Sequence, residues 1–101
     1  MMQKPVFTME HIVAKVKPLA DKYCVKEIYL FGSYARGEAD ENSDLDFLVY
    51  GGEKFKRTMI FALAEDLRET LEKKVDVFEI GEVNPDSNFY KTIMKEKVLV
   101  A

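Results

Sequence analysis

One stretch constrains the fold more than any other part of the chain: LFGSYARGEADENSDLDF, at positions 30 to 47. A hydrophobic segment runs into Gly32 and Ser33, crosses a polar turn, and continues as a second hydrophobic segment that begins with Asp44-Leu45-Asp46. Two carboxylates at the start of an apolar strand cost stability unless a positive charge meets them. The remaining sequence must therefore indicate the source of such a positive charge, either a basic side chain or a bound cation.

Hydrophobic spacing around this stretch predicts both helices and strands. Helical spacing covers residues 8 to 23, with Thr8 as the N-cap, and residues 54 to 73. Pro18 either kinks the first helix or begins a second short one. Three segments have the apolar pattern of strands: residues 26 to 31, 45 to 50 and 75 to 80.

The end of the chain adds a last short helix that starts at Asn84-Pro85-Asp86, and residues 97 to 100 form a terminal strand or a tail. The order helix, strand, strand, helix, strand, helix predicts an α/β (α+β) fold, in which helices flank one small mixed β-sheet. Because the 101 residues contain no linker, repeat or low-complexity segment, we expect a single domain over residues 1–101.

Composition excludes several classes of protein. No apolar run approaches the roughly 20 residues of a membrane helix, and the N-terminal residues lack the apolar segment of a secretory signal. A single cysteine, Cys24, excludes an internal disulfide, so we expect a cytoplasmic protein without membrane contact. A net charge of −3 argues against direct nucleic-acid binding, which depends on cationic contacts to phosphates. A nucleotide with a neutralising metal ion remains compatible with this charge.

Gly32 and Ser33 form a turn that could hold an anion. Glycine at a strand end lets the backbone turn sharply and approach a ligand closely. Successive N–H groups at such a turn bind phosphate, and the serine hydroxyl adds a donor. Gly-Ser is also a common loop dipeptide, so an ordinary turn is the simpler interpretation of this pair taken alone.

Asp44 and Asp46 stand two residues apart on a strand, which directs both carboxylates to one face. The opposite face is apolar and is expected to pack under a helix; it consists of Leu45, Phe47 and Val49. Like charges held close together raise each other's pKa, and a divalent cation such as Mg²⁺ relieves the repulsion. The alternative is a solvated turn, because Asn42, Ser43 and Asp44 are all common turn residues.

Asp76 lies inside the otherwise apolar strand segment VDVFEI, where a lone carboxylate is costly unless it is paired or metal-bound. If the second and third strands are neighbours, Asp76 joins Asp44 and Asp46 at one site. Three carboxylates beside a phosphate-binding turn suit two-metal nucleotidyl transfer, in which the ions lie about 3.5–4 Å apart. The alternative is an edge-strand acid that pairs with Lys73 or Lys74.

The motif GSYARGEADENSDLDFLV, with Gly-Ser and Asp-x-Asp separated by ten residues and a later aspartate in VDVFEI, resembles the DNA polymerase β-type nucleotidyltransferase superfamily. More narrowly, it resembles the minimal nucleotidyltransferases, which are often encoded beside a helical HEPN partner. The resemblance covers nearly the whole chain and implies the polymerase β-like fold. It also implies that Gly32 and Ser33 bind the nucleotide phosphates, that Asp44 and Asp46 bind the metals, and that Asp76 completes this catalytic metal site.

Other residues near the motif leave alternatives open. Arg36 is a candidate nucleotide-binding residue that would neutralise a phosphate; the alternative is a salt bridge that shapes the turn. Tyr34 either stacks on a ligand or packs in the core. Lys54, Lys56 and Arg57 form a basic run at the predicted start of a helix, where a solvated face is favoured over contact with a triphosphate.

The resemblance implies a Mg²⁺-dependent nucleotidyltransferase, with two ions and ATP as substrate, that moves AMP onto a hydroxyl of a partner protein and releases pyrophosphate. The implied partner is a HEPN-type RNase toxin, of which this chain would be the antitoxin. The alternative is a non-catalytic subunit that binds nucleotide and metal and neutralises its partner by complex formation. A small-molecule acceptor is disfavoured, because such enzymes usually carry a further helical domain. Homo-oligomerisation is left open.

Overall fold

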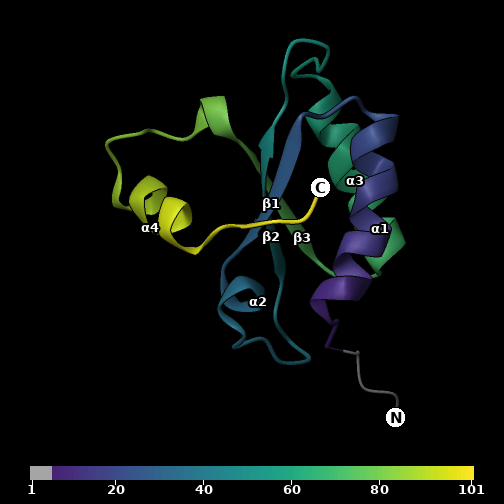
Figure 1. Ribbon diagram of the computed structural model, residues 1–101, viewed down its shortest axis with the longest axis vertical. Coiled ribbons are helices and arrows are strands. Elements are labelled where there is room, and N and C mark those ends of the chain that lie inside the picture. The colour runs from purple at the N-terminus through teal and green to yellow at the C-terminus, as the bar shows by residue number, and fades with distance from the viewer. Residues whose placement is uncertain (1–5) are drawn as a thin grey trace.

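The computed structural model describes residues 6–101, in which one mixed sheet is flanked by helices (Figure 1). The helices are α1 (Met9–Lys22), α2 (Ser33–Arg36), α3 (Met59–Leu71) and α4 (Asn88–Glu96), with a 3₁₀ turn η1 (Ile80–Glu82). The strands are β1 (Glu27–Phe31), β2 (Leu45–Tyr50), β3 (Val75–Glu79) and β4 (Val98–Leu99). The predicted α/β class and the mixed sheet are confirmed.

The sheet has the strand order β3-β2-β1-β4. β1 pairs antiparallel with β2 and β4, whereas β2 and β3 pair in parallel. A parallel pair requires a crossover connection, which α3 supplies between these two strands. The register sets Asp46 opposite Phe31 of β1 on one side and opposite Asp76 of β3 on the other. The second and third strands are therefore neighbours, which is the condition under which Asp76 was expected to lie near the other two acids.

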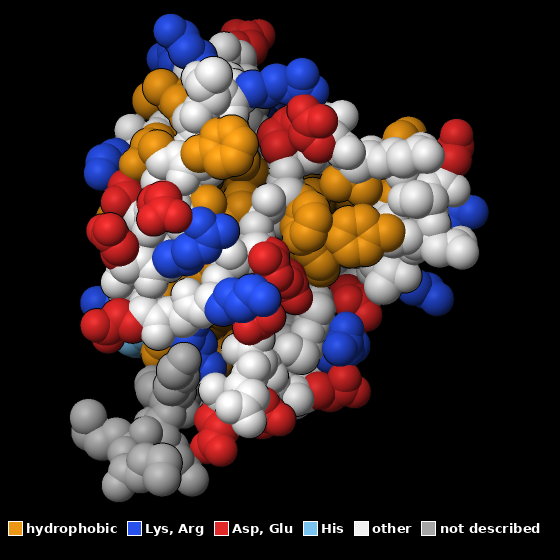
Figure 2. Space-filling view, turned by 180° about the vertical axis from the view of Figure 1, so that it is seen from behind, with side chains coloured by type: hydrophobic (Ala, Val, Ile, Leu, Met, Phe, Trp, Pro, Cys, Tyr) orange, Lys and Arg blue, Asp and Glu red, His pale blue; other side chains and the backbone are white. Residues whose placement is uncertain are grey.

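Helices α1 and α3 cover one face of the sheet, and α4 lies on the other side (Figure 1). The larger core lies under α1 and α3, where Leu45, Phe47 and Val49 of β2 are completely buried. Leu48 points to the opposite face and packs in a smaller cluster with Phe31, Val83 and Ile93. On the surface seen in Figure 2, hydrophobic side chains gather between the sheet and α4. The predicted alternation along β2 is confirmed.

The first helix is a single helix that continues through Pro18. Its N-cap is Thr8, as predicted, and the Thr8 hydroxyl accepts a hydrogen bond from the backbone N–H of His11 at 3.1 Å. The alternative of a second helix starting at Pro18 is wrong. Proline removes one N–H bond to the residue four positions earlier, and because that residue, Ala14, is exposed, water can satisfy its carbonyl.

The second long helix starts at Met59 and not at residue 54, so the predicted start is wrong. Phe55 fits the helical spacing, but it packs against the larger core from a loop. Lys54, Lys56 and Arg57 consequently lie in this loop and not in the first turn of a helix. Hydrophobic spacing detects that a residue is buried and does not distinguish a loop residue from a helical one.

The last helix was predicted to start at Asn84 and begins at Asn88 instead, where Ser87 is the N-cap and its hydroxyl accepts from the N–H of Tyr90. Asn84 forms a turn before the helix, in which its side-chain oxygen accepts from the N–H of Asp86 at 2.9 Å. The end of the chain is a strand and not a tail, because β4 pairs with β1. Among the described residues, no helix combines the length and hydrophobicity needed to cross a membrane.

We expect Phe47→Ala to lower the free energy of unfolding by about 3–5 kcal/mol, because it empties a completely buried position under α1 and α3. Phe61→Ala is the matched control: this ring is 78% exposed, and its loss should change stability by no more than about 0.5 kcal/mol. Urea unfolding measures both values. Similar losses for the two variants would contradict the core described here.

Candidate active site

The turn after β1 is a single helical turn, α2, where the sequence predicted only a polar turn. Gly32 precedes it with φ 78° and ψ −155°, a backbone conformation that is restricted to glycine. A Cβ atom on this residue would collide with Oδ2 of Asp46. Glycine is therefore required here twice, for its backbone conformation and for the close approach of the Asp46 carboxylate.

The three acids lie where the parallel strands β2 and β3 begin: Asp44, Asp46 and Asp76. Asp46 and Asp76 are register neighbours on adjacent parallel strands, and Asp44 comes directly before β2. The Asp44 carboxylate lies 3.7 Å from the ammonium group of Lys74. Lys73 instead donates to the carbonyl oxygens of Glu41 and Ser43. Within residues 6–101, neither lysine forms an ion pair with Asp76, although β3 is an edge strand as the alternative interpretation required.

The pKa of the Asp46 carboxyl is raised from 3.8 to about 6, mainly because burial disfavours the charged form and also because the negative charges of Asp76 and Asp44 lie nearby. The positive charges of Arg36 and Lys74 oppose this shift only in part. The folded chain therefore holds a half-buried carboxylate among like charges. Such an arrangement is typical of functional sites, where a bound cation relieves the repulsion.

The carboxylates match the ligand preference of Mg²⁺ for oxygen donors, and the charge repulsion at Asp46 is the cost that a divalent cation would remove. In the described part of the chain, however, no three His, Cys, Asp or Glu side chains are gathered closely enough to hold a metal ion. Asp44, Asp46 and Asp76 as one metal site therefore remain a prediction. The donor chemistry of the three carboxylates fits the metal.

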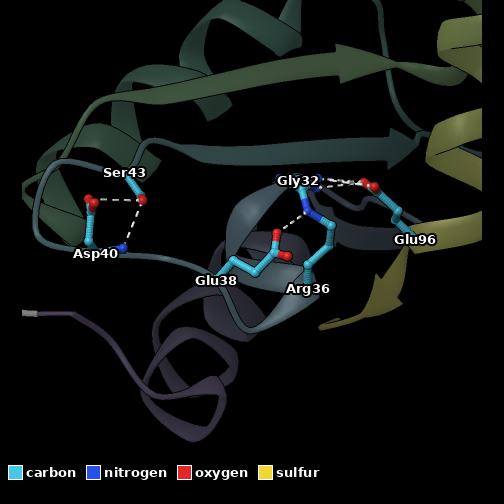
Figure 3. A network of polar contacts seen from close by, with 6 residues as sticks. All are labelled: Gly32, Arg36, Glu38, Asp40, Ser43 and Glu96. Carbon is cyan, nitrogen blue, oxygen red and sulfur yellow. Dashed lines mark hydrogen bonds and ion pairs between the residues drawn. The ribbon is translucent and has the colours of Figure 1, made fainter.

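Arg36 connects α2 to α4 through Glu96 (Figure 3). Its Nη1 donates to both carboxylate oxygens of Glu96 at 3.0 and 3.2 Å, and its Nε donates to Glu38 at 2.7 Å. The backbone N–H of Gly32 also donates to Glu96, at 3.3 Å. Arg36 thus forms the salt bridge that was one of its two interpretations. The Glu96 carboxylate is an anion bound at the turn where the sequence predicted a phosphate.

The loop before Asp44 is fixed by local polar contacts. The hydroxyl of Ser43 accepts from the N–H of Asp40 at 2.9 Å and contacts the Asp40 carboxylate at 3.3 Å (Figure 3). Asp40 also accepts from the N–H of Asn42 at 2.8 Å. Tyr34, the second residue of α2, is buried in the larger core, so packing and not exposed stacking is its observed role. The loop that leads into Asp44 is accordingly ordered by its own side chains.

A cavity of about 370 Å³ lies between the α2 turn and α4. Of the residues predicted for the site, five line it: Gly32, Ser33, Arg36, Asp44 and Asp46. Asp76 is not part of this lining. Sequence reasoning missed the other side of the cavity, which consists of Phe31 and of Phe89, Thr92, Ile93 and Glu96 from α4.

The α4 residues of the cavity follow the spacing i, i+3, i+4, i+7, so they lie on one face of the helix. This spacing is visible in the sequence and could have identified the face. Nothing in the sequence indicates that this face meets the α2 turn, because Glu96 and Arg36 are 60 residues apart.

The comparison with known families settles the class of protein. Residues 14–101 match the family described as polymerase beta, nucleotidyltransferase. The chain belongs to this family. The resemblance found in the sequence motif and the predicted polymerase β-like fold are thereby confirmed, and the site lies in a nucleotidyltransferase domain.

Two relatives match over most of their length. The chain is 36% identical to the protein adenylyltransferase MntA of Thermococcus cleftensis, covering 94% of this chain and 98% of the relative. It is 35% identical to a protein of Methanocaldococcus jannaschii named as a candidate protein adenylyltransferase, covering 90% of each chain.

A solved structure supports the fold independently. The chain is similar to one in the complex of a tri-AMPylated Shewanella oneidensis HEPN toxin with an MNT antitoxin, with a TM-score of 0.70 over 93% of this chain and 72% of the other. At 19% identity, this similarity concerns the fold alone.

Gly32→Ala should destabilise the protein by at least about 2 kcal/mol, because it adds backbone strain and a collision with Asp46. Gly37→Ala is the control for a positive φ without a close contact: its φ of 73° is similar, its ψ of 22° lies in the left-handed helical region, and a Cβ there meets nothing within 4 Å. The control should cost only about 1 kcal/mol. Urea unfolding of both variants measures the difference, and equal costs would show that Gly32 does not make room for Asp46.

Without metal, the contribution of Asp46 to the stability of the protein should fall as the pH rises from about 4 to about 6. Folding raises the pKa of Asp46, so the folded state retains a proton that the unfolded state has lost in this range. Asp46→Asn cannot titrate and should gain stability relative to the wild type over this interval. Urea unfolding in chelator at several pH values measures the difference in unfolding free energy between Asp46→Asn and the wild type. Asp21→Asn, a substitution of an exposed residue on α1, is the control. A free-energy difference between Asp46→Asn and the wild type that does not change with pH would contradict the raised pKa of Asp46.

Proposed function

We propose that the protein is a Mg²⁺-dependent protein adenylyltransferase, which transfers AMP from ATP to a hydroxyl of a HEPN-type toxin and acts as its antitoxin. The observation that carries the proposal is that Asp44 and Asp46 share one cavity with the Gly32–Ser33 turn, on a chain of the nucleotidyltransferase family. The names of the two relatives support the reaction, and the toxin complex of similar fold supports the kind of partner.

The residues of the cavity, together with Asp76 beside it, would have different roles in the reaction. Asp44 and Asp46 would hold two Mg²⁺ ions, with Asp76 completing the set; the metal supplies charge neutralisation for the phosphates. The N–H of Gly32 and the hydroxyl of Ser33 would bind phosphate oxygens, in the place that the Glu96 carboxylate takes at the Gly32 N–H. This arrangement stabilises a phosphorylated ligand mainly by position and charge.

In the proposed step, the oxygen of the acceptor hydroxyl forms a bond to the α-phosphorus of ATP. The bond from this phosphorus to the bridging oxygen of the β-phosphate breaks, and pyrophosphate leaves with that oxygen. The Asp76 carboxylate is the candidate base that accepts the hydroxyl proton, because it lies beside Asp46 near the start of β3. No covalent intermediate on the protein is needed.

The size of the cavity fits a nucleotide. Its volume of about 370 Å³ is at the lower end of the roughly 300–1,000 Å³ typical of small-molecule sites. We therefore assign the cavity to ATP and expect the acceptor hydroxyl to come from the surface of a second protein. Because ATP and Mg²⁺ are cytoplasmic solutes, the proposal places the reaction in the cytoplasm.

The test is transfer of label from α-labelled ATP to the purified HEPN-type partner in the presence of Mg²⁺. Asp44→Asn combined with Asp46→Asn should lower the rate at least about 100-fold, since it removes the candidate metal ligands. The control Asp21→Asn changes an exposed aspartate on α1 and should transfer at the wild-type rate.

An undiminished rate in the double variant would exclude these aspartates from the reaction. If instead the wild type transfers no label, and the double variant neutralises the partner as well as the wild type does, the protein is a binding subunit and not an enzyme. Either result contradicts the proposed function.

A further inference from the structure

An exposed aromatic ring borders the cavity of the candidate active site. Phe89 is the second residue of α4 and lies on the helix face that lines the cavity, yet 45% of its surface is exposed. Ile93, one turn later on the same face, is buried in the smaller hydrophobic cluster. Exposed apolar side chains are common on protein surfaces, but this ring lines the cavity of the candidate site, where a ligand could cover its exposed part.

The ring is held in place by two other phenylalanines. Its centroid lies 5.3 Å from that of Phe78, at an interplanar angle of 66°, and 5.9 Å from that of Phe31, at 74°. These are edge-to-face arrangements, which are favourable for aromatic pairs. Phe31 is the buried last residue of β1 and directly precedes Gly32. The position of the Phe89 ring is therefore fixed relative to the turn that is the candidate phosphate site.

The cavity has walls of different polarity. Its apolar lining consists of Phe31, Phe89 and Ile93, and its polar lining of Ser33, Arg36, Asp44, Asp46, Thr92 and Glu96. On the surface seen in Figure 2, hydrophobic side chains between the sheet and α4 lie next to acidic and basic ones. A nucleotide has the same division, because its phosphates are charged and the faces of its base are apolar. The lining thus offers an apolar surface to a base and polar groups to the phosphates.

We propose that Phe89 is the stacking platform for the base of the bound nucleotide. The base lies on the exposed part of the ring, and the phosphates extend toward Ser33 and the aspartates. This inference rests on the proposed function, since it assigns the base end of the same ATP site. Phe89 is a binding residue in this arrangement and takes no part in bond making or breaking. Stacking tolerates every base, so it supplies affinity and not base selectivity.

The experiment compares two ligands, ATP and tripolyphosphate, by titration calorimetry with Mg²⁺ present. Phe89→Ala should weaken ATP binding about 5- to 150-fold, the range measured for loss of one base–aromatic stack. It should leave tripolyphosphate binding unchanged, because tripolyphosphate has no base. Phe61→Ala removes another exposed ring, on α3, and should affect neither ligand.

A second variant covers the case in which Phe89→Ala disturbs α4. Phe89→Trp keeps an aromatic face. Because the natural sequence contains no tryptophan, the fluorescence of this variant reports on position 89 alone. We expect the variant to bind ATP with wild-type affinity, and its fluorescence to change on addition of ATP but not of tripolyphosphate.

The outcomes separate this inference from the proposed function. If the wild type binds ATP but Phe89→Ala weakens neither ligand, or weakens both equally, stacking on Phe89 is excluded while the nucleotide site stands. A Phe89→Trp signal that does not respond to bound ATP excludes it as well. If the wild type does not bind ATP at all, the proposed function fails and this inference fails with it.

Discussion

The parallel pairing of β2 and β3 is the constraint on which the site depends, because it sets Asp46 beside Asp76. Two carboxylates in neighbouring register positions repel each other, and burial adds to the cost, as the raised pKa of Asp46 shows. The opposite face of β2 carries the larger hydrophobic core under α1 and α3, which stabilises the strand in this register. A shift by one residue would turn the acids into that core. The core thus maintains a charge arrangement that is unfavourable by itself.

The second requirement is the close approach of two chain segments at Gly32. The backbone of this residue comes so near to Asp46 that an added Cβ atom would displace the Asp46 carboxylate, and the N–H of Gly32 contacts Glu96 of α4. Arg36 completes the connection by its ion pair with Glu96. The turn, the acids and α4 are therefore coupled, and a nucleotide that displaces Glu96 from the turn would also act on the position of α4 and its Phe89 ring.

Much of the fold and of the candidate site could be predicted from the sequence, because hydrophobic alternation identified β2 and the motif identified the family. The sequence also marked Asp76 as unusual, since a lone carboxylate in an apolar strand is costly, and the parallel pairing of β2 and β3 sets it beside Asp46. The starts of α3 and α4 were wrong because Phe55 and Asn84 satisfy their patterns from loops. Glu96 could not be predicted as a partner of Arg36, because only tertiary structure brings the end of α4 to the α2 turn.

The central claim is that the repulsion among these aspartates serves to bind a metal–nucleotide complex. Calorimetric titration of ATP into the wild-type protein at pH 6, with Mg²⁺ and with chelator, in two buffers of different ionisation enthalpy, tests it most directly. We expect saturable binding only with Mg²⁺, accompanied by release of the Asp46 proton, which makes the observed enthalpy depend on the buffer. Binding that is equally strong in chelator, or that releases no proton, would contradict the claim.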